Sequence, residues 1–347
     1  MLLDVSYLRF FVIFAFEFVL FSSATTSDHG VTPYTFSGGY GGMGCPSLAE
    51  SGTMQVEMNY LSKLSGNPRY AQKANAFYDT VRSQPSMHGL WPNCWQHGRG
   101  RITFGADGDS FYEYLIKGWL QTGRKDNKLW QMYNAAVDGM QKYLVATGSD
   151  GLTYLNNFNM ASSNGIGSVD VAMEHLACFV PGWLALGVPH QDDVARAAEH
   201  TALAEKLAYT CWQMYEQQPT GIGPERVKGM RIDLSRTDTK EYILRPEAVE
   251  GWWYMMELKG ADGGGDKYRE WGWRTFLNFE RHLRVPHGYA SIRDVRSRRP
   301  SHMDRMESFF LAETLKYLYL LQDPKRQIRP DTHVLNTEAH PFSLDGL

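Results

Sequence analysis

The sequence lacks several features that would place it in common functional classes. Its 347 residues contain no Asn-X-Ser/Thr sequon, so N-glycosylation gives no indication of where the protein resides. The four cysteines form no Cys-X-X-Cys pair, which argues against a structural zinc site. The 35 basic and 38 acidic residues are interspersed and leave a net charge of −3, without a lysine- and arginine-rich stripe. This distribution excludes a typical nucleic-acid partner, and the densest basic run, residues 293–300, is interpreted as a solvated loop.

The first 46 residues differ from the rest of the chain. Residues 8–21 (LRFFVIFAFEFVLF) form an apolar run with Arg9 near its start, shorter than the ~20 apolar residues that a membrane-spanning helix needs. We therefore predict a signal peptide or signal anchor over residues 1–25, the latter with membrane association. Residues 26–46 are predicted to be an irregular, glycine-rich linker. Entry into the secretory pathway would allow one or two disulfides among the four cysteines.

From Ser47 onward, the sequence shows helical periodicity and few strand signals. In three places an apolar helix ends at a glycine and a second helix opens after a short turn: residues 49–66 and 68–81, 113–123 and 125–144, and 249–260 and 266–283. Further helical segments are expected at 171–187, 192–217 and 303–322, giving roughly nine or ten helices. A short hairpin is expected at 288–295. Repeated αα-hairpins predict an all-α fold arranged as a toroid or solenoid rather than a compact bundle.

Aromatic residues are abundant, with 10 Trp, 19 Tyr and 17 Phe. Packing explains most aromatic residues in any chain, but such a set also offers stacking faces to a ligand such as a sugar. With 43% apolar residues, the chain is long enough for one large domain or two ordinary ones.

Carboxylates recur at the starts of apolar helices, where an acid surrounded by apolar residues normally needs a partner. They form the pairs Asp109/Glu113, Glu247/Glu250 and Glu307/Glu313, with Glu338 and Glu50 in addition. Each could simply cap a helix, because acids in a first turn interact favourably with the helix dipole. In a closed ring of hairpins, however, the helix starts converge on one cavity. Clustered acids there would raise each other's pKa values and would call for a cation or for sugar chemistry.

Six segments carry a resemblance to a known family: GDSFYEYLIK (108–117), MEHLACFVPGWLALG (173–187), YILRPEAVE (242–250), YREWGW (268–273), ESFFLAETLKYLYLL (307–321) and NTEAHPF (336–342). They resemble, in the same order, the signature segments of glycoside hydrolase family 47, the class I α-1,2-mannosidases that trim N-glycans in the endoplasmic reticulum and Golgi. The resemblance implies an (αα)7 barrel, a bound Ca²⁺ and hydrolysis with inversion at the anomeric carbon. Inversion requires an acid and a base separated widely enough to admit a water molecule.

The resemblance also implies roles for individual residues. Glu247 matches the general base, Asp109 matches a second active-site carboxylate proposed as the acid, and Glu225 matches another acidic position of the pocket. Arg245 and His175 match pocket-lining polar positions, with a buried, structurally satisfied pair as the alternative.

Further matches concern the sugar, the cation and the cysteines. Phe309 matches the aromatic residue that stacks on the terminal mannose, and Thr337 matches the direct calcium ligand. Waters around the ion would be held by four acids: Glu50, Glu250, Glu313 and Glu338. Glu50 and Glu313 would also contact the sugar. Cys178 and Cys211 match the family's disulfide, whereas Cys45 and Cys94 have no match and are either free or paired with each other.

One family motif has no counterpart in this sequence. Residues 1–46 contain no NLFE-(S/T)-x-x-R segment, whose glutamate is the usual candidate for the general acid. We therefore expect residues 47–347 to form a partial catalytic domain, an incomplete (αα)7 barrel of reduced stability, from a truncated or shortened gene product.

Three functions remain open at this stage. The first is a calcium-dependent α-1,2-mannosidase acting on high-mannose N-glycans, with Asp109 or Glu225 donating the proton. The second is a non-catalytic mannose-binding protein, and the third is a non-functional fragment. The expected protein is a monomer on the lumenal side of the Golgi or endoplasmic reticulum, or alternatively secreted. Several segments, such as NTEAHPF, favour the Golgi type.

Overall fold

The computed structural model describes residues 45–160, 167–232, 239–260 and 264–344. The predicted signal segment (1–25) and nearly all of the predicted linker (26–46) lie outside the described residues. Ten α-helices occur in the described part: α2 (Leu48–Gly52), α3 (Gln55–Ser65), α4 (Arg69–Arg82), α5 (Asp109–Gln121), α6 (Asn127–Tyr143), α7 (Val180–Gly187), α8 (Val194–Glu216), α9 (Glu247–Lys259), α10 (Asp266–His282) and α11 (Leu315–Gln322). The predicted all-α class is confirmed.

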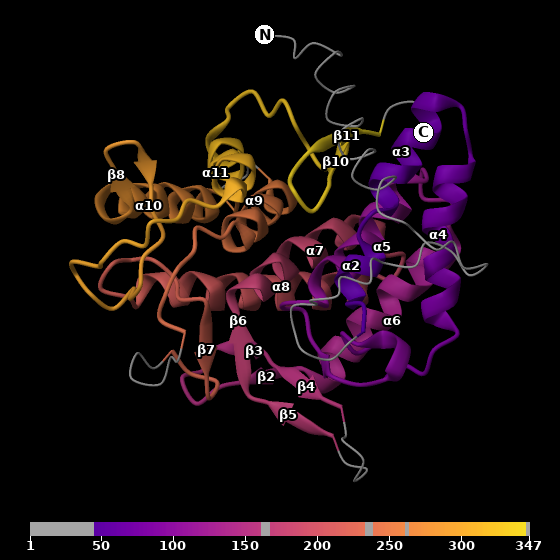
Figure 1. Ribbon diagram of the computed structural model, residues 1–347, viewed down its shortest axis with the longest axis horizontal. Helices are drawn as coiled ribbons and strands as arrows, with labels where there is room; N and C mark the ends of the chain where they lie inside the picture. Colours follow the sequence, from indigo (N-terminus) through magenta and orange to yellow (C-terminus); the bar gives the residue numbers. More distant parts are fainter. Residues whose placement is uncertain (1–44, 161–166, 233–238, 261–263, 345–347) are drawn as a thin grey trace.

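The helices form an inner and an outer layer. Helices α5, α7 and α9 are buried on almost every face, as expected for helices that are apolar all round. The amphipathic helices α4, α6 and α10 each bury one face only. Within the inner layer α7 packs against both α5 and α9, and α9 packs against α11. The outer helices α6, α8 and α10 lie against α5, α7 and α9, so successive αα-hairpins run side by side around an arc (Figure 1).

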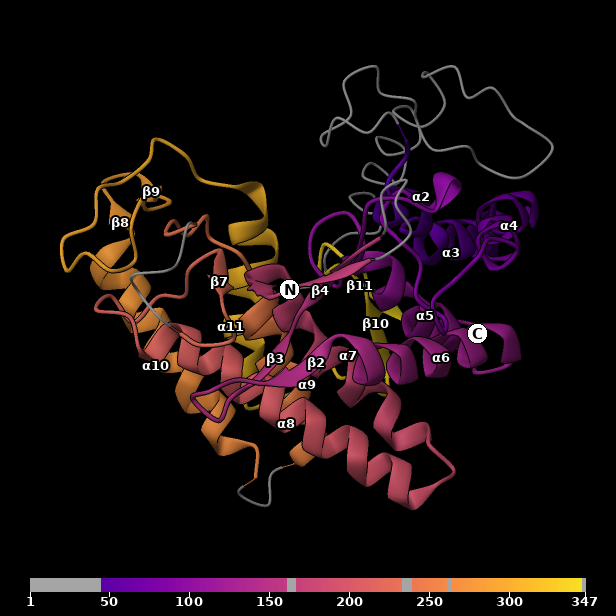
Figure 2. The same ribbon diagram turned by 90° about the horizontal axis from the view of Figure 1, so that it is seen from below.

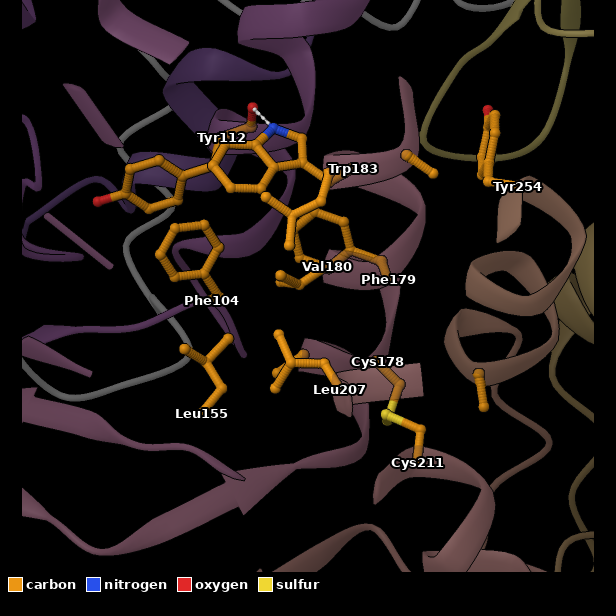
Figure 3. Packing of buried hydrophobic residues seen from close by; sticks show 14 of the residues in the cluster. Phe104, Tyr112, Leu155, Cys178, Phe179, Val180, Trp183, Leu207, Cys211 and Tyr254 are labelled. Atoms are coloured by element: carbon orange, nitrogen blue, oxygen red, sulfur yellow. Dashed lines mark hydrogen bonds between the residues drawn. A yellow bond between two sulfur atoms is a disulfide. The ribbon is translucent and has the colours of Figure 1, made fainter. Parts of the chain in front are cut away.

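The core between these layers is aromatic (Figure 3). Phe104 stacks on Tyr112 with ring centroids 4.3 Å apart, and the Trp183 indole N–H donates to the Tyr112 carbonyl at 2.8 Å. Nearby, Cys178 and Cys211 form the disulfide that the resemblance implies, joining the segment before α7 to α8. Cys45 and Cys94 also form a disulfide, so of the two alternatives left open by the sequence they are paired.

The strands are short and mostly connect helices. They are β1 (Arg101–Ile102), β2 (Val145–Thr147), β3 (Thr153–Leu155), β4 (Asn157–Asn159), β5 (Ser168–Asp170), β6 (Ala172–Glu174), β7 (Arg226–Lys228), β8 (Arg284–Val285), β9 (Gly288–Tyr289), β10 (His333–Leu335) and β11 (Pro341–Ser343). They form one three-stranded sheet, β1-β4-β5, and four two-stranded sheets, all antiparallel.

Two of the two-stranded sheets position functional side chains. The β6–β7 pair aligns Glu174 with Arg226, which brings the following residue, His175, beside Glu225. The β10–β11 hairpin lies between the part of the chain that holds α3 to α5 and the part that holds α9 to α11 (Figures 1 and 2). Its Phe342 ring meets Tyr60 of α3 edge-on, with centroids 4.9 Å apart.

Three sequence predictions about elements were wrong in detail. Residues 49–66 are not one helix but two, because the chain bends at Thr53 and Met54 between α2 and α3. Residues 171–187 begin with strand β6 and a 3₁₀ turn (His175–Phe179), since residues 172–174 pair with β7. The hairpin expected at 288–295 lies earlier, at 284–289, and Ile292 instead bridges to Tyr242 and His302.

Across the described ranges, no helix combines the length and apolar character needed to cross a bilayer.

Candidate active site

The first cluster of candidate residues surrounds Glu247, the first residue of α9. His175 is fully buried and its Nδ1 lies 3.0 Å from Glu247 Oε2, while its Nε2 lies 2.6 Å from the Tyr215 hydroxyl of α8. Burial alone would raise the pKa of Glu247. The hydrogen bond from His175 and the charge of Arg245 more than offset burial, so the net pKa of this carboxyl is lowered. Glu247 is therefore ionised at neutral pH.

A backbone turn directly before α9 fixes the position of Arg245. Leu244 is buried with φ at +72°, a left-handed conformation that a leucine adopts only when its surroundings hold it there. Its carbonyl accepts a hydrogen bond from the Thr314 hydroxyl at 2.6 Å, which ties this turn to the start of α11. The Arg245 guanidinium donates through Nε to Glu225 Oε2, and the Ile243 N–H donates to Glu225 Oε1 at 3.1 Å. The cation is thus held between two carboxylates, Glu225 and Glu247.

Asp109 begins α5, after the loop Gly105–Gly108. Its Oδ1 accepts the Ser110 N–H at 2.8 Å. Burial raises the pKa of Asp109 to about 8; Glu247 and Glu113 add to this effect, and the Ser110 hydrogen bond opposes it. Arg245 interacts electrostatically with both Asp109 and Glu247. Two carboxyl groups around one guanidinium therefore favour opposite protonation states at neutral pH, which is the arrangement that acid–base catalysis needs.

A second group of polar side chains surrounds the tip of the β10–β11 hairpin. The Tyr114 hydroxyl of α5 donates to Glu57 Oε1 at 2.7 Å and accepts the Thr337 N–H at 3.2 Å. The Asn336 side chain donates to the same Glu57 oxygen at 2.7 Å. The other carboxylate oxygen, Glu57 Oε2, is buried and has no hydrogen-bond partner among the described residues. A buried carboxylate oxygen without a partner is costly and indicates a site for a further ligand.

More acids lie beside this hairpin tip than cations. Glu113 and Glu250 contact Lys117, with 3.6 Å between Lys117 Nζ and Glu250 Oε1. Glu313 lies on a π-helical turn, Phe310–Thr314, an irregularity often found at functional sites. Burial raises its pKa to about 10, with further contributions from Glu338, Glu247 and other acids. Burial likewise raises the pKa of Glu250 to about 8, and Lys117 opposes this effect.

This donor set consists of oxygen atoms and carries uncompensated negative charge, which fits a hard cation. Within the described residues, no three His, Cys, Asp or Glu side chains are close enough together to hold a metal ion directly. A cation here would therefore take ligands such as the Thr337 hydroxyl and carbonyl, and would reach the carboxylates through water.

The remaining candidates from the sequence lie nearby or elsewhere. Glu338 is solvent-exposed at the hairpin tip, and its pKa is raised by partial burial. Phe309 is half-buried directly before the π-helical turn. Glu307 pairs with Arg305. Glu50 is exposed and closes a capping box with Ser47 at the start of α2; it also acts electrostatically on Asp107.

Sequence reasoning missed Glu57. It stands in the first turn of α3, an acid among apolar residues, and so carries the same signal that identified Asp109 and Glu250. Residues 49–66 were expected to form a single helix with Glu50 at its start, and the resemblance gave the role beside the cation to Glu50 rather than to Glu57. The structure instead starts a new helix at Gln55 and brings Glu57 to the hairpin tip.

Comparisons with known proteins agree with this geometry. The chain is 36% identical over 314 residues to mannosyl-oligosaccharide 1,2-alpha-mannosidase IB of Homo sapiens, covering 88% of this chain and 47% of that protein. It is 35% identical over 317 residues to the human endoplasmic reticulum mannosyl-oligosaccharide 1,2-alpha-mannosidase, covering 86% of this chain and 43% of that protein. The chain thus spans about half the length of these relatives.

A solved structure supports the fold. The structure of the alpha-1,2-mannosidase from Trichoderma reesei matches with a TM-score of 0.74 and 28% identity, over 86% of this chain and 66% of that one. This match confirms the predicted fold class, the all-α architecture of helical hairpins that the alpha-1,2-mannosidase shares. The sequence profile of Glycosyl hydrolase family 47 matches residues 25–344, and the chain belongs to this family.

Proposed function

We propose that this protein is an α-1,2-mannosidase that hydrolyses terminal α-1,2-linked mannose from high-mannose N-glycans with inversion. The observation that carries the proposal is the opposite shift of two carboxyl pKa values around Arg245: Glu247 is lowered and Asp109 is raised to about 8. Inverting glycosidases require such a pair, one carboxylate to activate water and one carboxylic acid to protonate the departing oxygen.

In the proposed reaction, Glu247 takes a proton from the water that attacks the anomeric carbon. As the new C–O bond forms, the glycosidic C–O bond breaks, and Asp109 gives its proton to the leaving oxygen, directly or through a water. His175 and Arg245 hold Glu247 as the ionised base. Both oxygens of Glu225 already accept hydrogen bonds, from Arg245 and from the Ile243 N–H, so Glu225 orients the guanidinium and we assign the proton transfer to Asp109.

The cation proposed for the hairpin tip is Ca²⁺. Thr337 would bind it directly, and waters held by Glu57, Glu250, Glu313 and Glu338 would complete the shell. The buried, unpartnered Glu57 Oε2 supports this assignment. When bound, the ion supplies positive charge that orients sugar hydroxyls.

The sugar itself would stack on Phe309, which leads into the π-helical turn that carries Glu313. Glu50, exposed at the start of α2, would also contact the glycan, as the resemblance implies. Two disulfides and the names of the relatives support a lumenal location in the Golgi or endoplasmic reticulum, and we propose a monomer.

Mannose release from a high-mannose glycan by the purified protein tests the proposal. We expect release that stops in chelator and returns with Ca²⁺, with β-mannose as the first product by NMR because inversion converts the α-linkage. Glu247→Gln should abolish release. The control Glu199→Gln changes an exposed glutamate of α8 and should leave activity unchanged. Glycan binding without any release would instead establish a mannose-binding protein.

A further inference from the structure

Lys117 is the one buried lysine or arginine in the described ranges of the chain, with 1% of its side chain exposed. It lies on the inner helix α5, one turn after Glu113, and its ammonium donates to the Glu113 carboxylate. Its second acidic neighbour is Glu250 of α9, at 3.6 Å. Burying a lysine is costly unless it is paired, so its position inside the ring requires an explanation.

The aromatic ring of Tyr254 also lies beside the Lys117 ammonium. Lys117 Nζ lies 5.7 Å from the centre of the Tyr254 ring, within the range of a cation–π interaction. The buried ammonium therefore has Glu113, Glu250 and the Tyr254 ring as neighbours. Burial lowers the pKa of Lys117, but its interactions with Glu113, Tyr254 and Glu250 more than offset burial, and the group remains an ammonium ion.

The interactions of Glu250 show how Lys117 acts on the cation site. Glu250 Oε1 accepts a hydrogen bond from the Tyr317 hydroxyl at 3.2 Å and lies 3.6 Å from Lys117 Nζ. This fixes the carboxylate through one oxygen and leaves Oε2 for a water molecule. Lys117 therefore orients a carboxylate of the proposed cation site without reaching the hairpin tip itself.

Two other cations lie near the acids: the charge of Arg245 acts on Glu247 and Asp109, and that of Lys316 acts on Glu313 and Glu338. Arg245 is bound to Glu225, and the half-buried Lys316 donates to the Ala339 carbonyl at 2.8 Å. Lys117 is the fixed positive charge between Glu113 of α5 and Glu250 of α9 when no metal ion is bound.

We propose that Lys117 is a built-in counter-ion of the carboxylate group: it holds Glu113 and Glu250 in place without a divalent cation, and it limits how tightly that cation binds. The second part rests on the proposed calcium site, whereas the first does not. A fixed positive charge near a divalent cation opposes its binding, and carboxylates without a counter-charge destabilise a folded interior.

Two measurements on Lys117→Met test this proposal: the Tm in chelator and the Kd for Ca²⁺ by calorimetry. We expect a lower Tm in chelator together with a Kd that is roughly tenfold smaller, because the variant removes a buried positive charge beside two acids of the proposed site. Lys117→Arg keeps the charge and should keep the wild-type Kd. The matched control Lys128→Met removes a partly exposed lysine that pairs with Asp79 at the surface, and it should change neither value.

An equal loss of Tm with and without Ca²⁺, at unchanged Kd, would show that Lys117 only packs and would overturn the proposal. If Lys117→Met does not fold, Glu113→Gln serves instead. This variant removes one acid but keeps Lys117, so it should weaken Ca²⁺ binding about tenfold. An unchanged Kd would contradict the proposal.

The double variant Lys117→Met/Glu113→Gln removes both charges of the pair. It should recover part of the Tm that Lys117→Met loses in chelator, and no recovery would refute the counter-ion role. A wild-type protein that binds no Ca²⁺ would disprove the calcium site and the affinity claim. The measurements in chelator would still decide the counter-ion role.

Discussion

The pH dependence of mannose release is the sharpest test of the proposed acid–base pair. Asp109 has a pKa of about 8 instead of 3.8, because it is buried and close to other acids. At pH 6.5 it is therefore about 97% protonated, whereas an ordinary aspartic acid would be roughly 0.2% protonated. The difference in available acid is about 500-fold. Glu247, with its lowered pKa, stays ionised over the same range.

We therefore expect kcat/KM to be level between about pH 5 and 7.5 and to fall roughly tenfold per pH unit above pH 8. Asp109→Asn should lower kcat by ~10²–10⁴ and remove the basic limb, since an amide cannot supply the proton. Glu174→Gln is a finer probe: it removes a charge that raises the pKa of Asp109, so the basic limb should move to lower pH.

The matched control is Glu199→Gln, for which the profile should be that of wild type. A rate that stays level to pH 9.5, or an Asp109→Asn variant within threefold of wild type, would show that Asp109 is not the acid.

Three further predictions concern stability. Because the folded-state pKa values of Glu313 (about 10) and Glu250 (about 8) lie above the ordinary 4.5, stability in chelator should fall as pH rises above 4.5. Between pH 6 and 8 the loss should be on the order of 5 kcal/mol by calorimetry, and excess Ca²⁺ should remove it. Tyr114→Phe removes the hydroxyl that accepts the Thr337 N–H and should lower the free energy of unfolding by ~2 kcal/mol in urea titrations, with weaker Ca²⁺ binding. An unchanged midpoint would contradict the assigned network. Replacing Cys178 and Cys211 by serine removes a crosslink across 33 residues and should lower the free energy of unfolding by about 3–4 kcal/mol in the same titration. An unchanged free energy of unfolding would show that the two cysteines are reduced in the wild-type protein.

Local signals in the sequence predicted most helices well. The segment expected at 68–81 became α4 (Arg69–Arg82), and that expected at 192–217 became α8 (Val194–Glu216). The failures came from contacts distant in sequence. The break at Thr53 is accompanied by a hydrogen bond from its hydroxyl to Ser110, 57 residues away, and β6 exists because it pairs with β7. Periodicity within a short window cannot detect either contact.

The site shows the same division between local and long-range information. Motif resemblance pointed to Glu247 and Asp109 as the base and the acid, and the structure adds that their carboxyl pKa values shift in opposite directions, as the proposed roles require. The resemblance did not identify Glu57, whose hydrogen bond to Asn336 comes from the distant hairpin. Nor did it reveal Lys117 as a buried charge, because a lysine in a helical pattern normally points to solvent.

The β10–β11 hairpin has a consequence for the order of folding. Its tip contacts residues far back in the chain: Asn336 bonds Glu57 across 279 residues, and Thr337 bonds Tyr114 across 223. During synthesis, α3 and α5 leave the ribosome long before the segment that completes their polar contacts. Contacts of such high sequence separation form late, so Glu57 stays hydrated until the hairpin docks. A cation bound at the site proposed above would then stabilise only those chains whose hairpin has already docked, and so would act on the last step of folding.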